Sequence, residues 1–151
     1  MLLMSLFFCI QAKTQTTNIS GIINTYHSIV EIIPAKACVR VTSTVGLSVS
    51  ETIMIIQMKG AAVQTNTNST FGDTTALNNA GNYELNTICG IKGDSVFLFF
   101  NLLNGYTVAG KVQVVGIPNY YSATVTATLS AKPWDNATGT GVYFQFSINY
   151  N

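Results

Sequence analysis

The residues that could carry chemistry are few and widely spaced in this chain. Its 151 residues include seven Lys or Arg, six Asp or Glu and a single His, and charged residues make up 9% of the sequence. Average soluble domains contain about 25% charged residues. A Ser-His-Asp or Cys-His arrangement would have to use His27, which has no motif around it. We therefore expect His27 to be structural or exposed, and we expect no enzymatic activity.

The acidic residues lie in different segments, and most of them stand next to turns. A glycosidase needs two carboxylates close together, calcium needs several in one loop, and a zinc site needs about four ligands. Solvated turn positions explain these residues better than a catalytic pair or a metal site, so we expect no metal or other cofactor. The six acidic residues are Glu31, Glu51, Asp73, Glu84, Asp94 and Asp135.

Aromatic side chains offer the one binding chemistry that the sequence supports. Exposed Trp and Tyr side chains bind sugars by stacking and C–H contacts, and Trp134 with Tyr120 and Tyr121 could form such a ligand-binding site. The alternative is that Trp134 fills one end of the hydrophobic core. The sequence favours core filling, because a lone Trp in a small domain usually packs.

The first twelve residues, 1–12, are interpreted as a secretory signal peptide. Residues 2–10 form an apolar run that is broken only by Ser5 and is too short to span a bilayer, and Ala12 is a small residue suited to the position before a cleavage site. A buried first strand is the alternative, and no Lys or Arg precedes the run. We predict export, with the protein secreted or located at the cell surface.

Removal of this peptide would leave Cys38 and Cys89 in the chain. An oxidising compartment permits a disulfide between them. The bridge would close a loop of about fifty residues and add roughly 4 kcal/mol of stability. Two buried free thiols are the alternative, and the sequence favours them because nothing in it fixes the geometry of a bridge.

Short strands dominate the pattern, since no helical period of useful length occurs. Residues 52–58 form an apolar run that predicts a central strand covered on both faces. Residues 83–91 and 96–100 flank a tight turn and predict a hairpin. Residues 123–129 alternate and predict a half-exposed strand, and residues 142–150 predict one face of a last strand. Further strands are expected at residues 18–23, 28–33, 38–42 and 111–117.

These strands, separated by Gly, Asn and Pro turns, predict an all-β domain, a small β-barrel or β-sandwich that ends in an incomplete edge strand. Residues 60–82 are rich in Thr, Asn, Ser and Gly and predict one long polar loop.

The net charge of +1 gives no electrostatic footprint for nucleic acid or anionic lipid. The Thr-rich face of 123–129 also argues against a membrane strand. We expect no nucleic-acid partner and no membrane insertion.

Six segments carry a resemblance to a known group of proteins through their order and spacing. They are VRVTSTVGLSV (39–49), TIMIIQMKG (52–60), NAGNYE (79–84), GKVQVV (110–115), PNYYSATV (118–125) and AKPWDNATG (131–139). Together they resemble the N-terminal region of large secreted bacterial surface proteins that end in a gliding-motility-associated, type IX secretion sorting domain.

The resemblance implies an N-terminal β-domain at residues 13–141 that leads into a longer exported chain, commonly a parallel β-helix. That family usually has Gly-Asp where Ser50 and Glu51 stand. It would also continue with a longer strand series after Gly141, so residues 142–151 are interpreted as a truncated or frameshifted terminal strand.

The function that the resemblance implies is a non-enzymatic extracellular structural or adhesion module at the N-terminus of a larger surface protein. Its expected partners are the downstream domains of the full-length protein, with surface glycans as further candidates. The alternative is a carbohydrate-binding accessory domain of a β-helix polysaccharide-active protein, with Trp134, Tyr120 and Tyr121 as its ligand-binding residues.

Overall fold

Strands make up almost all regular structure in residues 16–148, the part of the chain that the computed structural model describes. The expected signal peptide and residues 149–151 lie outside this range. Two 3-10 helices, η1 (Pro34–Lys36) and η2 (Val108–Gly110), accompany the strands. The strands are β1 (Thr17–Gly21), β2 (Thr25–Ile33), β3 (Cys38–Val41), β4 (Thr52–Gln57), β5 (Ala62–Val63), β6 (Thr74–Ala76), β7 (Tyr83–Lys92), β8 (Ser95–Leu98), β9 (Val112–Ile117), β10 (Asn119–Tyr120), β11 (Ala123–Leu129) and β12 (Ser147–Ile148). The predicted all-β class is confirmed.

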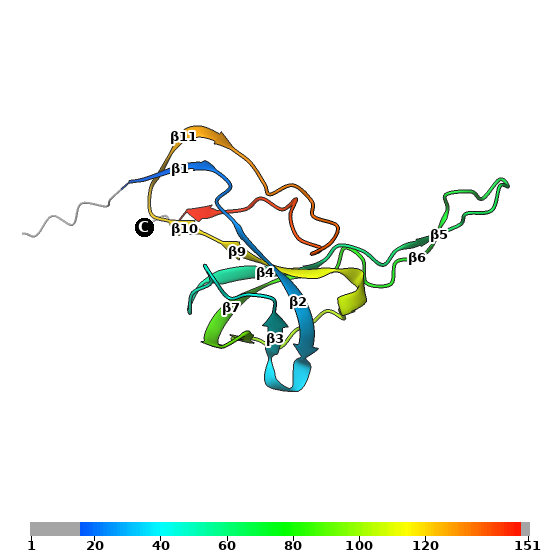
Figure 1. Cartoon of the computed structure of the whole chain (residues 1–151), viewed down its shortest axis with the longest axis horizontal. Coiled ribbons are helices and arrows are strands. Elements are labelled where there is room, and N and C mark those ends of the chain that lie inside the picture. Colours follow the sequence, from blue (N-terminus) through cyan, green and yellow to red (C-terminus); the bar gives the residue numbers. More distant parts are fainter. Residues whose placement is uncertain (1–15, 149–151) are drawn as a thin grey trace, which may run out of the picture.

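Six antiparallel strands close into a barrel in the order β2-β3-β8-β7-β4-β9, with β9 pairing back to β2 (Figure 1). The first half of β2 pairs with β9 and its second half pairs with β3, after an irregularity between Ile29 and Glu31. In the same way β7 passes from β4 to β8 across an irregularity between Ile88 and Gly90. A bulge bends its strand, so β2 and β7 form the corners that let the small sheet close.

Strands β4 and β9 are buried on both faces. Their inward side chains belong to the core inside the barrel and are Ile53, Ile55, Val112 and Val114. Their outward side chains form a second core, against which Tyr26 and Tyr143 pack, and are Met54, Ile56, Val115 and Ile117. The prediction of a central strand at 52–58, covered on both faces, is confirmed.

The chain after β11 folds back over the outer face of β4 and β9. The amide of Gln113 on β9 holds this cover in place: its Nε2 donates to the Gly141 carbonyl at 3.0 Å, and the Gly141 N–H donates to its Oε1 at 2.9 Å. In the described part of the predicted 142–150 segment, residues 142–148, strand structure is limited to β12, which pairs in parallel with β10. Val142 has a φ of 61°, outside the β region, and this interrupts an extended strand.

The predicted hairpin is confirmed as β7 and β8, with Lys92 opposite Ser95 and Gly93 in the turn at a φ of 60°. Strand β8 ends earlier than the apolar run suggests. Phe99 and Phe100 follow it with 66% and 62% of their surfaces exposed, packed edge to face on each other. They lie outside the barrel because the pairing of β7 with β8 stops at Leu98.

Strand β11 is more exposed than the half-exposed strand that its alternation predicts. It pairs in parallel with β1 and not with the barrel, and its five central residues are all exposed, including Val125 at 57%. The alternation of Ala, Val and Thr gave the right secondary structure. The prediction that one face of this strand is buried was wrong, because β11 lies on a separate two-stranded ladder.

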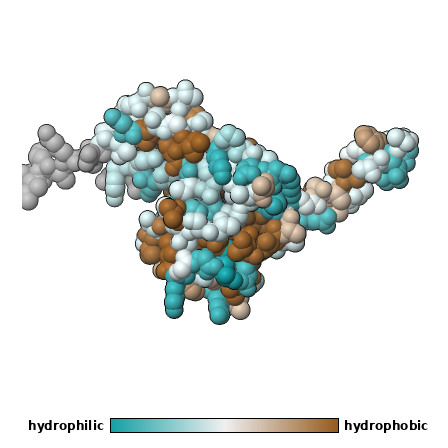
Figure 2. Space-filling model, in the orientation of Figure 1, coloured by the Kyte–Doolittle hydropathy of each residue, from teal (hydrophilic) through white to brown (hydrophobic). Residues whose placement is uncertain are grey.

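The segment 60–82 projects from the barrel as an arm (Figure 1). Its ends are joined by β5 and β6, a short antiparallel pair that the sequence did not predict. Most residues between these strands are exposed, and in Figure 2 the arm shows mainly pale and hydrophilic colours. Gln57, which is buried, fastens the base of the arm by donating from Nε2 to the carbonyls of Lys59 and Asn78 at 2.7 and 2.9 Å.

Cys38 and Cys89 are both free thiols, the first buried and the second exposed. Strand β8 lies between their strands, β3 and β7. Neighbouring strands are about 4.8 Å apart, so two spacings exceed the Cα separation of about 4.4–6.8 Å that a disulfide usually spans. A bridge would require β8 to move, so the geometry favours free thiols, but the expectation that both are buried is wrong for Cys89. No helix within residues 16–148 is long and apolar enough to cross a bilayer.

The interior of the barrel should be sensitive to the loss of single methyl groups. Ile55 is fully buried, so Ile55→Ala should lower the free energy of unfolding by about 2–5 kcal/mol. Val125→Ala, at an exposed position of β11, should change it by less than about 0.5 kcal/mol. Urea unfolding of both variants measures the difference, and equal losses would contradict this description of the core.

Candidate functional site

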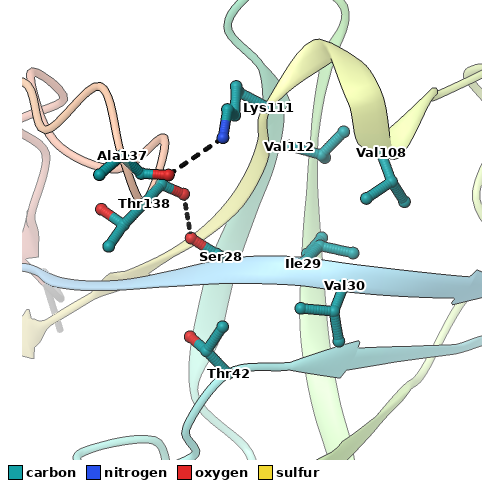
Figure 3. Close-up of a pocket in the computed structure, with 9 residues that line it drawn as sticks. All are labelled: Ser28, Ile29, Val30, Thr42, Val108, Lys111, Val112, Ala137 and Thr138. Atoms are coloured by element: carbon teal, nitrogen blue, oxygen red, sulfur yellow. Dashed lines mark hydrogen bonds between the residues drawn. The ribbon is translucent and has the colours of Figure 1, made fainter.

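A pocket of about 450 Å³ opens between β2, the start of β9 and the loop after β11 (Figure 3). Residues 132–140 form this loop, called here the rim loop. The pocket combines an apolar wall with a polar edge. The wall is formed by Ile29, Val30, Val108 and Val112, and the edge is formed by Ser28, Thr42, Lys111, Ala137 and Thr138.

The rim loop is shaped by its own acidic residue. The carboxylate of Asp135 accepts hydrogen bonds from the Ala137 N–H at 2.9 Å and from the Thr138 hydroxyl at 2.6 Å. These bonds lower the pKa of Asp135, so the carboxylate stays ionised while it holds the turn. The Asp135 N–H also donates to the Thr140 carbonyl at 2.9 Å, which closes the loop on itself.

Three lysine side chains reach the rim loop from different parts of the chain. Lys59 follows β4, Lys111 precedes β9, and Lys132 lies in the loop. The Lys59 ammonium bonds to the Asn136 side-chain oxygen. The Lys111 Nζ donates to the Ala137 carbonyl at 3.0 Å, and the Lys132 Nζ donates to the Thr140 hydroxyl at 2.8 Å. Each lysine therefore meets a neutral oxygen here.

Lys111 is held above the pocket by its backbone and by a glycine. It has a φ of 57° at the end of η2. Its stem runs over Gly139, where a Cβ would stand 2.7 Å from the Lys111 Cδ. Only a residue without a side chain leaves room for the lysine there. Figure 3 shows the Lys111 amine pointing across the pocket toward Ala137, while Ser28 bonds to the Thr138 carbonyl.

Trp134 lies on the rim loop and is half-buried. It belongs to neither of the two cores described above. The Lys59 ammonium stands 5.8 Å from the centre of its ring, within the range of a cation–π contact. Trp134 thus borders the lysine cluster and does not fill the barrel.

The two tyrosines of the expected sugar site lie elsewhere. Tyr120 is on β10, where its ring centre is 6.3 Å from that of Phe146. Tyr121 follows it with 66% of its surface exposed. The ring contacts found within residues 16–148 do not join either tyrosine to Trp134, so the structure does not bring the three aromatic residues into one cluster.

His27 is a buried residue of β2. It is 7% exposed on β2, opposite Val114 of β9, and its Nε2 has no hydrogen-bond partner. Burial lowers its pKa below the usual 6.5, and the nearby positive charge of Lys132 lowers it further, while a hydrogen bond with the Ser43 backbone acts the other way.

The carboxylates serve local structure. Arg40 bonds to Glu31 at 2.8 Å and to Asp94 at 2.7 Å on the barrel surface. Glu84 accepts hydrogen bonds from two backbone N–H groups of the segment after β8. Glu51 accepts one from the Ser48 N–H at 2.8 Å, and burial raises its pKa above the usual value. Asp94 and Glu51 stand at turns as interpreted, whereas Glu31 and Glu84 lie within β2 and β7.

Sequence reasoning did not single out Lys111, Ser28 or Thr138 as site residues. Lys111 and Thr138 lie in two of the segments that carry the resemblance but were given no binding role, and the three residues come from β2, the start of β9 and the rim loop. One pattern in the sequence was available: Lys59, Lys111 and Lys132 all lie just outside strands, in a chain with only seven basic residues. That pattern does not show that the three lysines converge.

No protein-family model matches this sequence, and no curated protein matches it. A search of solved structures found partial similarity to the Gp54 tailspike of Acinetobacter baumannii bacteriophage AP22 in complex with A. baumannii capsular saccharide. The TM-score is 0.45 at 8% sequence identity, and the match covers 73% of this chain. The match spans 17% of that tailspike chain. A likeness at this level carries no conclusion about function.

The buried imidazole predicts a pH dependence of stability. The folded pKa of His27 lies below its unfolded value of about 6.5, so the unfolded chain takes up the proton first as the pH falls. The free energy of unfolding should therefore decrease below about pH 6.5, by at most about 1.4 kcal/mol per pH unit. Urea unfolding between pH 7.5 and about pH 5 measures this slope.

The matched comparison is His27→Gln, which lacks the titrating group. The raised pKa of Glu51 acts in the opposite direction, because it favours the folded state as the pH falls, but it is common to both proteins. The variant should thus lose less stability on acidification than the wild type. Parallel curves for the two proteins would refute the role assigned to His27.

Proposed function

We propose that this chain is a non-enzymatic extracellular structural or adhesion module at the N-terminus of a larger surface protein. The observation that carries the proposal is the ladder of β1 and β11 outside the barrel, since a two-stranded ladder is marginal by itself. The five central residues of β11 are exposed, and its pairing within residues 16–148 is with β1. Further β structure of a longer chain could pack on this ladder and stabilise it.

The composition of the surface supports such packing. Burying a charge against a neighbouring domain is costly unless it is paired, and only 9% of this chain is charged. The exposed residues of β11 are Thr, Val and Ala, which can be covered at little desolvation cost. The filled barrel beside them supplies a rigid base.

The proposed location is tested on intact cells of the source organism. An epitope tag inserted after Asn68, in the exposed tip of the arm, should bind antibody without permeabilisation, because the arm projects away from the barrel (Figure 1). A tagged cytoplasmic protein serves as the control and should stain only after permeabilisation. If the Asn68-tagged protein also stains only after permeabilisation, the proposed location is wrong.

A carbohydrate-binding accessory domain is the second candidate, and the position of Trp134 favours it. The half-buried ring lies beside Lys59 and in neither core, on the same loop as the pocket residues Ala137 and Thr138. Tyr121 is exposed as well, whereas the ring of Tyr120 contacts Phe146. Trp134 is therefore the aromatic residue with the strongest case for contact with a sugar.

Trp134 is the single tryptophan of the chain, so its fluorescence reports binding directly. Glycans that shift this fluorescence should bind Trp134→Ala at least roughly tenfold more weakly in calorimetry, as expected for an aromatic anchor. Phe99→Ala, which removes a more exposed aromatic side chain directly after β8, should bind like the wild type. Equal affinity of all three proteins, or no binding at all, would remove the carbohydrate candidate.

A further inference from the structure

We propose that the pocket between β2, β9 and the rim loop binds a carboxylated sugar, a hexuronate unit, and that Lys111 pairs with its carboxylate. The proposal deepens the carbohydrate-binding candidate and rests on it. It assigns the acidic group of the ligand to a lysine that the sequence did not single out, and it places the sugar ring on the apolar wall of the pocket.

The charge around the rim loop is positive and unbalanced. Lys59, Lys111 and Lys132 bond to three neighbouring oxygens of the loop. Lys13 lies outside the described residues, so half of the six remaining Lys and Arg residues gather here. Asp135 is the one acidic residue of the loop, which leaves a net charge of +2.

Asp135 does not neutralise these lysines through direct contact. Its oxygens accept bonds from Ala137 and Thr138 within its own turn. Both ion pairs found in residues 16–148 belong to Arg40 on β3, so none of the three lysines takes part in an ion pair there. A ligand carboxylate would therefore offer Lys111 a stronger, charge-assisted bond than the neutral Ala137 carbonyl that it now contacts.

The walls of the pocket favour a sugar over a bare anion. Val30, which is 47% exposed, and the partly buried Val108 present apolar atoms over the nearly buried Ile29 and Val112, and the Ser28 and Thr42 hydroxyls stand at the edge (Figure 3). A pyranose ring has the same two sides, a C–H face and a rim of hydroxyls. An inorganic anion could reach Lys111 but would leave the apolar wall in water. The volume of about 450 Å³ lies within the usual range for small-molecule sites.

The pocket is held in shape before any ligand arrives. The β2–β9 ladder fixes one side, and the paired hydrogen bonds between Gln113 and Gly141 fix the end of the rim loop. Gly139, which has no side chain, leaves room for the Lys111 stem. A preformed site avoids part of the entropy cost of ordering side chains on binding, so a modest number of contacts can give measurable affinity.

The test compares an oligogalacturonate with a neutral galactose oligosaccharide of the same length and with inorganic phosphate. Binding is measured by calorimetry and by Trp134 fluorescence. The wild type should bind the oligogalacturonate at least roughly tenfold more tightly than the neutral oligosaccharide, with affinity falling as salt rises. Lys111→Met, which keeps an unbranched stem over Gly139, should lose this preference.

Two further variants distinguish binding at this pocket from a general effect of positive charge on the protein. Lys111→Arg keeps the charge and should retain the preference for the acid. Lys92→Met removes an exposed lysine from the β7–β8 hairpin and should bind like the wild type. Thermal unfolding of each variant establishes that it is folded before binding is measured.

The outcomes distinguish this inference from the carbohydrate candidate itself. Binding of neutral and acidic oligosaccharides with equal, Trp134-dependent affinity would keep the carbohydrate candidate and overturn the acidic pocket. Phosphate binding as tightly as the oligogalacturonate, or an unchanged preference in Lys111→Met, would also overturn it. Absence of binding to every oligosaccharide would remove both.

Discussion

The burial of β4 and β9 on both faces is the constraint on which the rest of this structure depends. Inward side chains such as Ile55 and Val114 fill the barrel, and outward ones such as Met54 and Val115 would meet water if nothing covered them. At about 25 cal/mol per Å² of apolar surface, exposure of such a face is costly. The segment after β11 must therefore return over the barrel, and that return creates the rim loop.

Two of the buried polar side chains of the barrel are glutamine amides, and both have hydrogen-bond partners. Gln57 and Gln113 are both buried, and a buried amide without partners costs about 1–3 kcal/mol. Gln57 bonds to the base of the arm, and Gln113 bonds in both directions to Gly141. In a chain with so few charges, neutral amides rather than ion pairs join the layers. The lysines around the rim loop are then left with neutral oxygens as their partners.

Much of the barrel follows from local patterns. The apolar run at 52–58, the hairpin across Gly93 and the strand expected at 38–42 all predict what the structure contains. Predictions that depended on a partner strand failed. Residues 123–129 have the right period for a strand, but their burial depends on which sheet they join, and β11 pairs with β1 outside the barrel. The last predicted strand is shortened because Val142 turns the chain at a positive φ.

The candidate site depends still more on the tertiary structure. The sequence identified Trp134 as a binding residue or a core residue, and the choice between these could not be made from one aromatic side chain without its neighbours. Lys59, Lys111 and Lys132 are separated by about fifty and about twenty residues, well beyond the range at which strand or turn periodicity relates side chains. The three lysines come together only because the chain after β11 folds back over β9.

The sequence by itself determined the all-β class and the central position of β4, because these follow from composition, from period-two alternation and from a continuous apolar run. The tertiary structure alone decided which strands close the barrel, where the tryptophan lies and which lysines share one loop. Those outcomes depend on contacts between residues far apart in the chain. The energies of these contacts come from mutual burial, so no single segment determines them.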